Sequence, residues 1–354
     1  MIPYSTSNIT PEDISAVTDV LHVNYLTRGN VTREFEDACQ NVTGKKHNIF
    51  VSNGTMGLFV ALACIEPSSD RIITTPLTFC AVANAAYWNG MHVRFCDVDP
   101  ETLCPEFPAL TDDDKHIIPV GLDYAGYPSL QFDPGYPNIL DACHSFGGRL
   151  ENGDPSCKYA TVAVYSFHPA KQITSGEGGL VSTDSDRIAE GVRGLRDNGR
   201  SNGLFCTPGM NLHGDEMSAA LALSQLKRLP DNLSRRRSLA HRYFSAFHPD
   251  LRLILPIDHP GHAYHLFPVQ FSNAVTESVE ILQKDLLEMG VGTQRHYRPL
   301  NTMPFFRARN NPSMPIAEHA YERMLSIPMY YGLTDAQQDH VIESINRTLD
   351  KYSK

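Results

Sequence analysis

Hydrophobic positions in the first two thirds of the chain alternate between short apolar runs and longer stretches with helical spacing. Residues 10–21 predict a first helix, because a capping threonine and a proline precede apolar residues at helical spacing. Apolar runs and helical patterns then follow one another. The strand-like runs are 48–51, 71–74, 91–95, 116–120, 138–140, 160–166 and 179–182, with helices from about residue 56 and over 81–88. This alternation predicts a mostly parallel sheet with helices on both faces.

The pattern changes after residue 215. A long helical stretch over 215–248 is interrupted at Pro230 and carries three arginines at 235–237, which we interpret as a solvated face or an interface edge in preference to an anion site. The later elements are predicted as strands at 251–255, 263–271 and 292–297, a helix over 279–290, and a last helix from Thr334 with Gln337 as its capping-box partner. The length fits a large domain over residues 1–240 and a smaller α+β domain over 241–354.

Composition and charge exclude several classes of protein. Of the 354 residues 42% are hydrophobic, and 30 Lys and Arg face 40 Asp and Glu, so nucleic acid is not an expected partner. The longest apolar run, 58–65, is far shorter than the roughly 20 residues of a membrane span. Because the start of the chain lacks signal-peptide features and the eight cysteines form no C-x-x-C pair, we expect a cytoplasmic protein with reduced thiols and no membrane association.

A lysine at position 171 has a local sequence suited to covalent chemistry. It lies between an apolar strand and a glycine-rich turn, in the segment 165–179. An amine held in a cleft there would lose hydration, which would lower its pKa and favour Schiff-base chemistry. A solvated loop lysine gives the same local pattern, so the neighbouring motifs decide between the two.

Three other motifs fit a pyridoxal phosphate (PLP) site. Asp141 ends the run 138–140 at the expected carboxyl edge of the sheet, where an acid could keep the PLP ring nitrogen protonated or only cap a turn. Ser52–Gly57 joins a strand to a helix, a junction that favours a phosphate, although an ordinary N-cap at Thr55 fits equally well and neither nucleotide-loop motif is present. Phe79 could lie flat on a cofactor ring or pack in the core.

With these motifs in place, the chain resembles the DegT/StrS-type sugar-nucleotide aminotransferases, which are fold-type I PLP enzymes. The resemblance implies their fold, a large domain with a mostly parallel sheet and helices on both faces plus a smaller α+β C-terminal domain. Several separated motifs in the right order are far more specific than any one alone. They lie at 25–29, 52–55, 75–79, 141–144, 166–179, 218–229, 296–300, 325–328 and 332–334.

The resemblance also implies roles for individual residues. Lys171 would bond covalently to the cofactor aldehyde, and Asp141 would pair with the ring nitrogen. The other cofactor contacts implied are phosphate binding by Gly54, Thr55 and Ser166, stacking by Phe79, and approach to the ring hydroxyl by His144. Thr27, His296 and Tyr297 match substrate-side motifs. Asn211 falls where the family places an asparagine that reaches the phosphate of the second subunit, which implies a homodimer with shared active sites.

Within the family, segments 123–126 and 167–171 are most similar to enzymes of pseudaminic-acid biosynthesis. The implied reaction moves an amino group from L-glutamate to C4 of UDP-2-acetamido-2,6-dideoxy-β-L-arabino-hexos-4-ulose, a UDP-linked 4-keto-6-deoxy sugar. Three alternatives remain: an aminotransferase for another nucleotide-linked ketosugar, a PLP-dependent sugar dehydratase, and a non-catalytic regulator with the same fold. The dehydratases usually have a histidine in place of the lysine. An NAD-dependent sugar epimerase is not supported, because its motifs are absent.

One position departs from the family pattern. The family usually has an aromatic residue and an arginine where this chain has Leu212 and His213, so a cation expected near the sugar diphosphate is missing. His213 at low pH, Arg28 and Arg298 are the candidates to replace it. No metal site is expected, because no H-E-x-x-H motif or paired C-x-x-C accompanies the histidines and cysteines.

Overall fold

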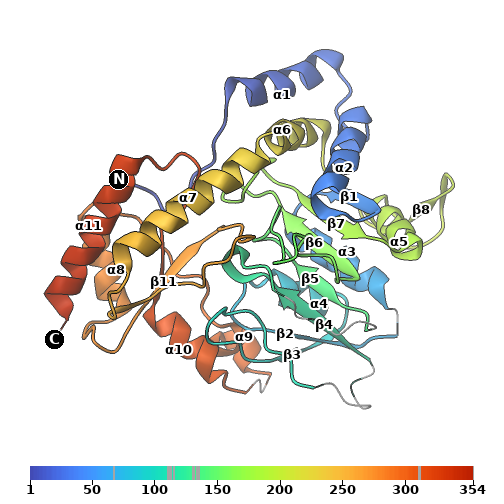
Figure 1. Cartoon of the computed structure of the whole chain (residues 1–354). Coiled ribbons are helices and arrows are strands. Elements are labelled where there is room, and N and C mark those ends of the chain that lie inside the picture. Colours follow the sequence, from blue (N-terminus) through green and yellow to red (C-terminus); the bar gives the residue numbers. More distant parts are fainter. Residues whose placement is uncertain are drawn as a thin grey trace.

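The computed structural model describes the chain except residues 67, 110–113, 115, 130–131, 133–135, 310–311 and 354. Its centre is a sheet of seven strands in the order β1-β7-β6-β5-β4-β2-β3 (Figure 1). The strands are β1 (His47–Val51), β2 (Arg71–Thr74), β3 (His92–Phe95), β4 (Ile117–Leu122), β5 (Ile139–Asp141), β6 (Val162–Ser166) and β7 (Gly179–Thr183). Among these strands only β7 runs antiparallel to its neighbours, so the other six end at the same edge.

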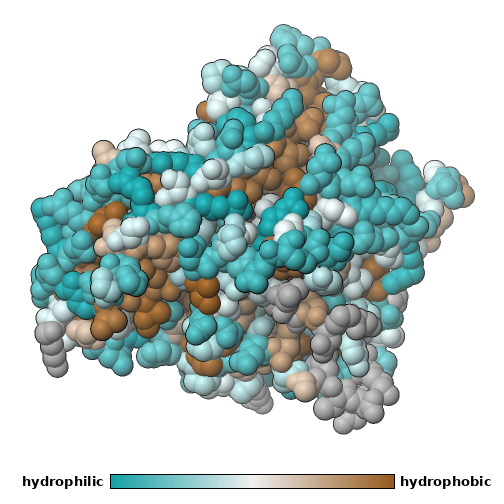
Figure 2. All heavy atoms as spheres, in the orientation of Figure 1, coloured by the Kyte–Doolittle hydropathy of each residue, from teal (hydrophilic) through white to brown (hydrophobic). Residues whose placement is uncertain are grey.

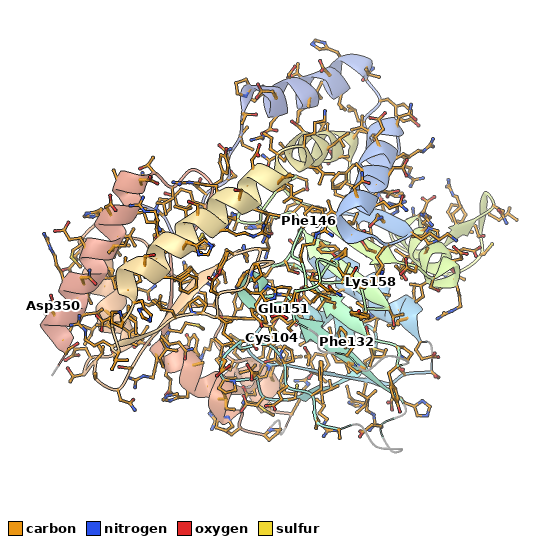
Figure 3. All side chains as sticks on the ribbon, in the orientation of Figure 1. Cys104, Phe132, Phe146, Glu151, Lys158 and Asp350 are labelled. Carbon is orange, nitrogen blue, oxygen red and sulfur yellow. The ribbon has the colours of Figure 1, made fainter. Side chains whose placement is uncertain are left out.

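Alternating side chains along each strand face two layers of helices. Val164 packs on one face of the sheet and Tyr165 on the other. The first face is covered by α3 (Gly54–Ile65), α4 (Ala81–Trp88) and α5 (Asp186–Arg196), and the second by α2 (Asn30–Thr43), α6 (Glu216–Leu226) and the first half of α7 (Leu229–Phe247). Phe146, labelled in Figure 3, lies in the second layer. The predicted mostly parallel sheet with helices on both faces is confirmed.

The C-terminal part has its own antiparallel sheet and hydrophobic core. It contains β10 (Leu253–Ile254), β11 (Phe267–Phe271) and β12 (Met324–Ile327), with α8 (Val279–Glu288), α11 (Asp335–Tyr352) and the second half of α7 packed against them. The remaining elements are α1 (Pro11–Val23), the hairpin of β8 (Arg200–Ser201) and β9 (Leu204–Phe205), α9 (Pro304–Arg307), α10 (Pro315–Arg323) and the short 3₁₀ helices Tyr124–Gly126 and Leu300–Thr302. Ile2 also packs in this core. The division at residue 240 falls within α7 and stays a prediction.

The predicted starts of the first and last helices are confirmed. α1 begins at Pro11, and the N–H of Thr10 donates to the Asp13 carboxylate at 3.0 Å. α11 follows Thr334, whose hydroxyl accepts from the Gln337 N–H at 3.2 Å while the Gln337 side chain accepts from the Thr334 N–H at 3.0 Å. Across the described ranges, no helix combines the length and the apolar character that membrane crossing requires.

Three local predictions are wrong. Residues 292–297 do not form a strand, because this segment is held at separate points, one of them the bridge from Gln294 to Ser326 of β12. The strand expected over 263–271 begins only at Phe267, because the chain bends before it and Tyr264 has φ 41°. The helix interruption expected at Pro230 instead lies at 227–228, between α6 and α7. Pro230 is in the first turn of α7, where a proline is tolerated.

The interpretation of the arginine triplet as a solvated face is also wrong for its middle member. Arg236 is 1% exposed. Its guanidinium donates to the carbonyl oxygens of Tyr264 at 2.9 Å and Met329 at 3.1 Å, and to the side-chain oxygen of Asn232 at 2.8 Å. Burial lowers the pKa of Arg236 to about 10. Arg236 therefore cross-links α7 to two loops of the C-terminal part.

Candidate active site

Loops that leave the parallel strands meet at the carboxyl edge of the large sheet. Asp141 is the last residue of β5 and Ser166 the last of β6. The loop 167–178 leaves β6, carries Lys171 and returns as β7, while residues 52–55 lead from β1 into α3. This edge is where open α/β sheets bind ligands.

The amine of Lys171 lies beside an imidazole. Its Nζ is 3.3 Å from Nε2 of His265, which comes from the loop before β11. Burial lowers the pKa of Lys171, while Cys143 and Asp141 act in the opposite direction. A lowered pKa leaves more of the amine unprotonated and able to attack, which fits the covalent role expected of Lys171.

Asp141 is a buried carboxylate with few partners. It is 5% exposed, and its Oδ1 accepts from the Cys143 N–H at 3.1 Å. Burial raises the pKa of Asp141, and the hydrogen bond from Cys143 and the charge of Lys171 oppose that rise. A protonated ring nitrogen would supply the cation that this buried carboxylate needs, so Asp141 fits the PLP ring.

His144, Tyr297 and Phe79 form an aromatic wall of the site. His144 Nε2 lies 3.2 Å from the Tyr297 hydroxyl, and the Tyr297 and Phe79 ring centroids are 6.0 Å apart. Gln172 donates to the His144 carbonyl at 2.6 Å and so fixes the histidine backbone. Nδ1 of His144 is buried with no partner among the described residues, which leaves it able to face a polar group of a cofactor.

The start of α3 abuts the end of β6. A Cβ built on Gly54 would lie 3.0 Å from the Ser166 Cβ, so only glycine fits there without displacement. Asn53 caps α3, because its side-chain oxygen accepts from the Met56 N–H at 2.9 Å, and Thr55 lies half-buried in the first turn. A helix N-terminus with a serine beside it is a site suited to a phosphate.

His296 connects the C-terminal part to the same edge. Its Nδ1 lies 2.9 Å from the Ser326 hydroxyl, and its carbonyl accepts from the Tyr124 hydroxyl. Its ring centroid is 5.4 Å from that of Tyr4, so the N-terminal segment also lies here. Burial, and then the charge of Lys171, lowers the pKa of His296 to about 4, so the imidazole is neutral near pH 7.

Thr27 and Asn211 lie apart from this cluster, on an exposed surface. Thr27 bridges to Asp215 and Asn211 to Asp197, which also pairs with Arg28 at 2.6 Å. Within the described parts of the chain, neither residue forms a hydrogen bond with Lys171. The roles of Thr27 and Asn211 therefore stay predictions.

Sequence reasoning missed His265, Gln172 and Asp123 as parts of the site. Asp123 follows β4, is fully buried, and accepts from the Ser145 hydroxyl at 2.6 Å, which anchors the loop after Asp141. The only sequence signal for His265 was a histidine inside an otherwise apolar run. In the described portion of the chain, no three His, Cys, Asp or Glu side chains cluster as a metal site requires.

Comparisons with known proteins match this arrangement over nearly the whole chain. The model of the DegT/DnrJ/EryC1/StrS aminotransferase family matches residues 7–346. The spore coat polysaccharide biosynthesis protein SpsC of Bacillus subtilis (strain 168) is 32% identical, over 97% of this chain and 96% of its own length.

Solved structures share the fold. PseC of Helicobacter pylori, an aminotransferase involved in the biosynthesis of pseudoaminic acid, has a TM-score of 0.91 at 24% identity, covering 99% of this chain and 100% of its own. Spr1654 of Streptococcus pneumoniae in its PLP form has a TM-score of 0.91 at 21% identity, covering 99% of both chains. The predicted fold class is confirmed.

Proposed function

Because this chain belongs to the DegT/DnrJ/EryC1/StrS aminotransferase family, we propose that it transfers the amino group of L-glutamate to C4 of UDP-2-acetamido-2,6-dideoxy-β-L-arabino-hexos-4-ulose. Pyridoxal phosphate is its cofactor. The observation that carries the proposal is the Lys171 amine, 3.3 Å from His265 at the edge where Asp141 ends β5. The choice of sugar is supported by segments 123–126 and 167–171 and by the shared fold of PseC.

The residues of the site divide the work of such a reaction. Bound PLP would supply an aldehyde and an electron-accepting ring. Lys171 would hold the aldehyde carbon, give way to the amino donor and then move a proton between the donor carbon and the cofactor. Asp141 would keep positive charge at the ring nitrogen, and the start of α3 with Ser166 would bind the phosphate.

The direct test is to supply purified protein with PLP and L-glutamate and then with a panel of UDP- and dTDP-linked ketosugars. Mass spectrometry and NMR of the products should show an amino group at C4 of the UDP-linked 4-keto sugar. Amination of a different nucleotide sugar alone would support the other transaminase candidate. A deoxygenated product would instead indicate a sugar dehydratase.

Replacing the reactive amine should abolish the reaction. Lys171→Ala should remove the absorbance of covalently bound PLP and lower turnover by at least about 10²–10⁴-fold, because proton transfer as well as covalent attachment is lost. Asp141→Asn should retain covalent binding but lower turnover, since a neutral amide does not hold the ring nitrogen positive. Absorbance spectra and single-turnover rates measure both effects, and a fully active Lys171→Ala variant would refute the mechanism.

A homodimer is supported by an apolar surface that one chain leaves uncovered. Val23 and Tyr25, at the end of α1 and just after it, are 74% and 59% exposed. A groove of about 970 Å³ lies between α1, α2 and α6, and Figure 2 shows apolar side chains gathered there. Soluble monomers rarely expose such patches, so a second copy is the occupant we propose. Val23→Asp should shift the protein towards monomer in sedimentation; an unchanged dimer would place the interface elsewhere.

The missing family arginine is best replaced by Arg28. Burial, and then Arg196 and Arg28, lowers the pKa of His213, so its imidazole carries no charge near pH 7. Arg28 is always charged and partly exposed beside Asp197. Arg28→Ala should raise KM for the nucleotide sugar about tenfold and leave KM for L-glutamate nearly unchanged, because a charge-assisted hydrogen bond to a phosphate is lost. His213→Ala is the comparison; a larger effect there would reverse the assignment.

A further inference from the structure

His265 is buried against the reactive amine, directly after a bend in the chain. It is 4% exposed, its Nε2 faces Nζ of Lys171 at 3.3 Å, and its ring centroid lies 4.4 Å from that of His144. The residue before it, Tyr264, has φ 41°, a left-handed conformation that a non-glycine residue adopts at a cost.

Several contacts hold Tyr264 in this strained conformation. Its ring stacks on His262 with centroids 3.9 Å apart, and its N–H donates to Nδ1 of His262 at 2.9 Å. Its hydroxyl donates to Asp258 at 2.6 Å, and its carbonyl accepts from the buried Arg236 at 2.9 Å. A strained residue fixed by so many contacts is typical of a functional site, and here its effect is to direct His265 at Lys171.

The tautomer of His265 follows from its surroundings. Nδ1 of this ring is buried and has no partner among the described residues. A hydrogen on Nδ1 would be an unsatisfied buried donor, so the hydrogen is favoured on Nε2, the nitrogen that faces Lys171. An N–H in that position can donate only to an amine with a free electron pair, and therefore favours uncharged Lys171.

We propose that His265 is a positioning residue whose Nε2–H donates to the uncharged amine of Lys171 and holds it in place for attack and proton transfer. The assignment rests on the proposed function, because it gives His265 a purpose in a reaction of that amine. The hydrogen bond from His265 would counteract the charge of Asp141, which favours the ammonium form of Lys171. Cys143, His144 and His296 also act on the amine, and Lys171, His144, Arg236 and His296 are the charged or titratable groups that act on His265.

The test measures Lys171 in the full chain freed of cofactor. The pH dependence of its modification by trinitrobenzenesulfonate, followed by peptide mass spectrometry, gives the midpoint at which the amine loses its proton. In His265→Leu this midpoint should rise by about one pH unit, since a buried hydrogen bond that favours the neutral amine is worth about one tenfold step. The leucine makes the surroundings more apolar, which alone would lower the midpoint, so a rise is diagnostic.

An unchanged or lower midpoint in His265→Leu would overturn the proposal. His265→Gln, whose amide N–H can still donate, should keep the midpoint near the wild-type value and shows that a folded variant was measured. His92→Leu, at an exposed histidine of the edge strand β3, is the matched control and should cause no shift. This readout needs neither PLP nor sugar, so it can fail while the proposed transamination holds.

The loaded enzyme gives a second readout. In His265→Leu, kcat should fall about tenfold or more with KM for L-glutamate nearly unchanged, because the amine acts in proton transfer and not in donor recognition. A rise in KM with constant kcat would instead assign His265 to donor binding and overturn the positioning role.

Discussion

Asp123 shows how burial alone sets the charge of one residue. Among the described residues no cation acts on it, and burial raises its pKa to about 7, with the hydrogen bonds from Ser145 and Ser129 opposing the rise. The folded state therefore binds this proton more tightly than the unfolded chain does. The contribution of protonated Asp123 to the free energy of unfolding is fully present below about pH 4 and is lost as the pH rises through 7.

Asp123→Asn should remove this pH dependence. The neutral amide cannot ionise, and it can still accept from the Ser129 N–H. In urea unfolding, the variant should gain up to about 3–4 kcal/mol relative to wild type between pH 4 and pH 8, from about 1.4 kcal/mol for each unit of pKa shift. Asp37→Asn, at an exposed position, is the control. A difference between variant and wild type that stays constant over this range would show that Asp123 is ionised throughout.

Which site residues could be predicted depends on how local their signal is. Lys171 and Asp141 each stand beside a strand end and a recognisable motif, so sequence reasoning found them. His265 lies 94 residues after Lys171, and only the bend at Tyr264 brings the two together. The bend is held by its neighbours His262 and Asp258 and by Arg236 of α7, and this distant third contact has no signal in the sequence around Tyr264.

At the scale of elements, α2 depends on a carboxylate from another helix. Glu216 is 2% exposed and accepts from the N–H groups of Gly29 at 2.9 Å, Val31 at 3.0 Å and Thr32 at 3.3 Å. Glu216→Ala leaves these first-turn donors buried without an acceptor and should cost about 2 kcal/mol or more. Thr334→Ala, which removes an exposed cap of α11, should cost about 1 kcal/mol. Urea unfolding compares the two, and equal losses would contradict the cross-helix cap.

The elements themselves were predictable where their pattern is local. The parallel strands and the caps of α1 and α11 follow from alternation and from capping residues a few positions apart. The local pattern of segment 292–297 predicts a strand. Its actual pairing, however, depends on distant partners, β12 and the N-terminal residues. Helical spacing predicted α1 correctly but not that Ile14 and Leu21 would face outward.

At the scale of the whole molecule, the residues expected at the PLP site are divided between two regions. Lys171, Asp141 and His144 meet at the sheet edge, whereas Asn211 lies on an exposed surface. The loop that begins at Ser52 lies next to Asn211, because the Ser52 N–H donates to the Leu212 carbonyl at 2.9 Å. The hairpin β8–β9 nearby projects from the body in Figure 1 and exposes Phe205 by 68%. Both features suit a surface that meets a second copy.

Mixing inactive variants distinguishes a shared site from a site within one chain. If Asn211 serves the partner's site, a dimer of one Lys171→Ala chain and one Asn211→Ala chain contains one complete site, because its intact Lys171 and intact Asn211 meet. Equal co-expression should then restore about a quarter of wild-type activity, as half of the dimers are mixed and each has one of two sites intact. Lys171→Ala mixed with Asp141→Asn is the control and should stay at the level of the parents, since both residues lie at one sheet edge of the same chain. No recovery in the first mixture would mean that Asn211 acts within its own chain, whereas a fully active Asn211→Ala parent would mean that it serves neither site.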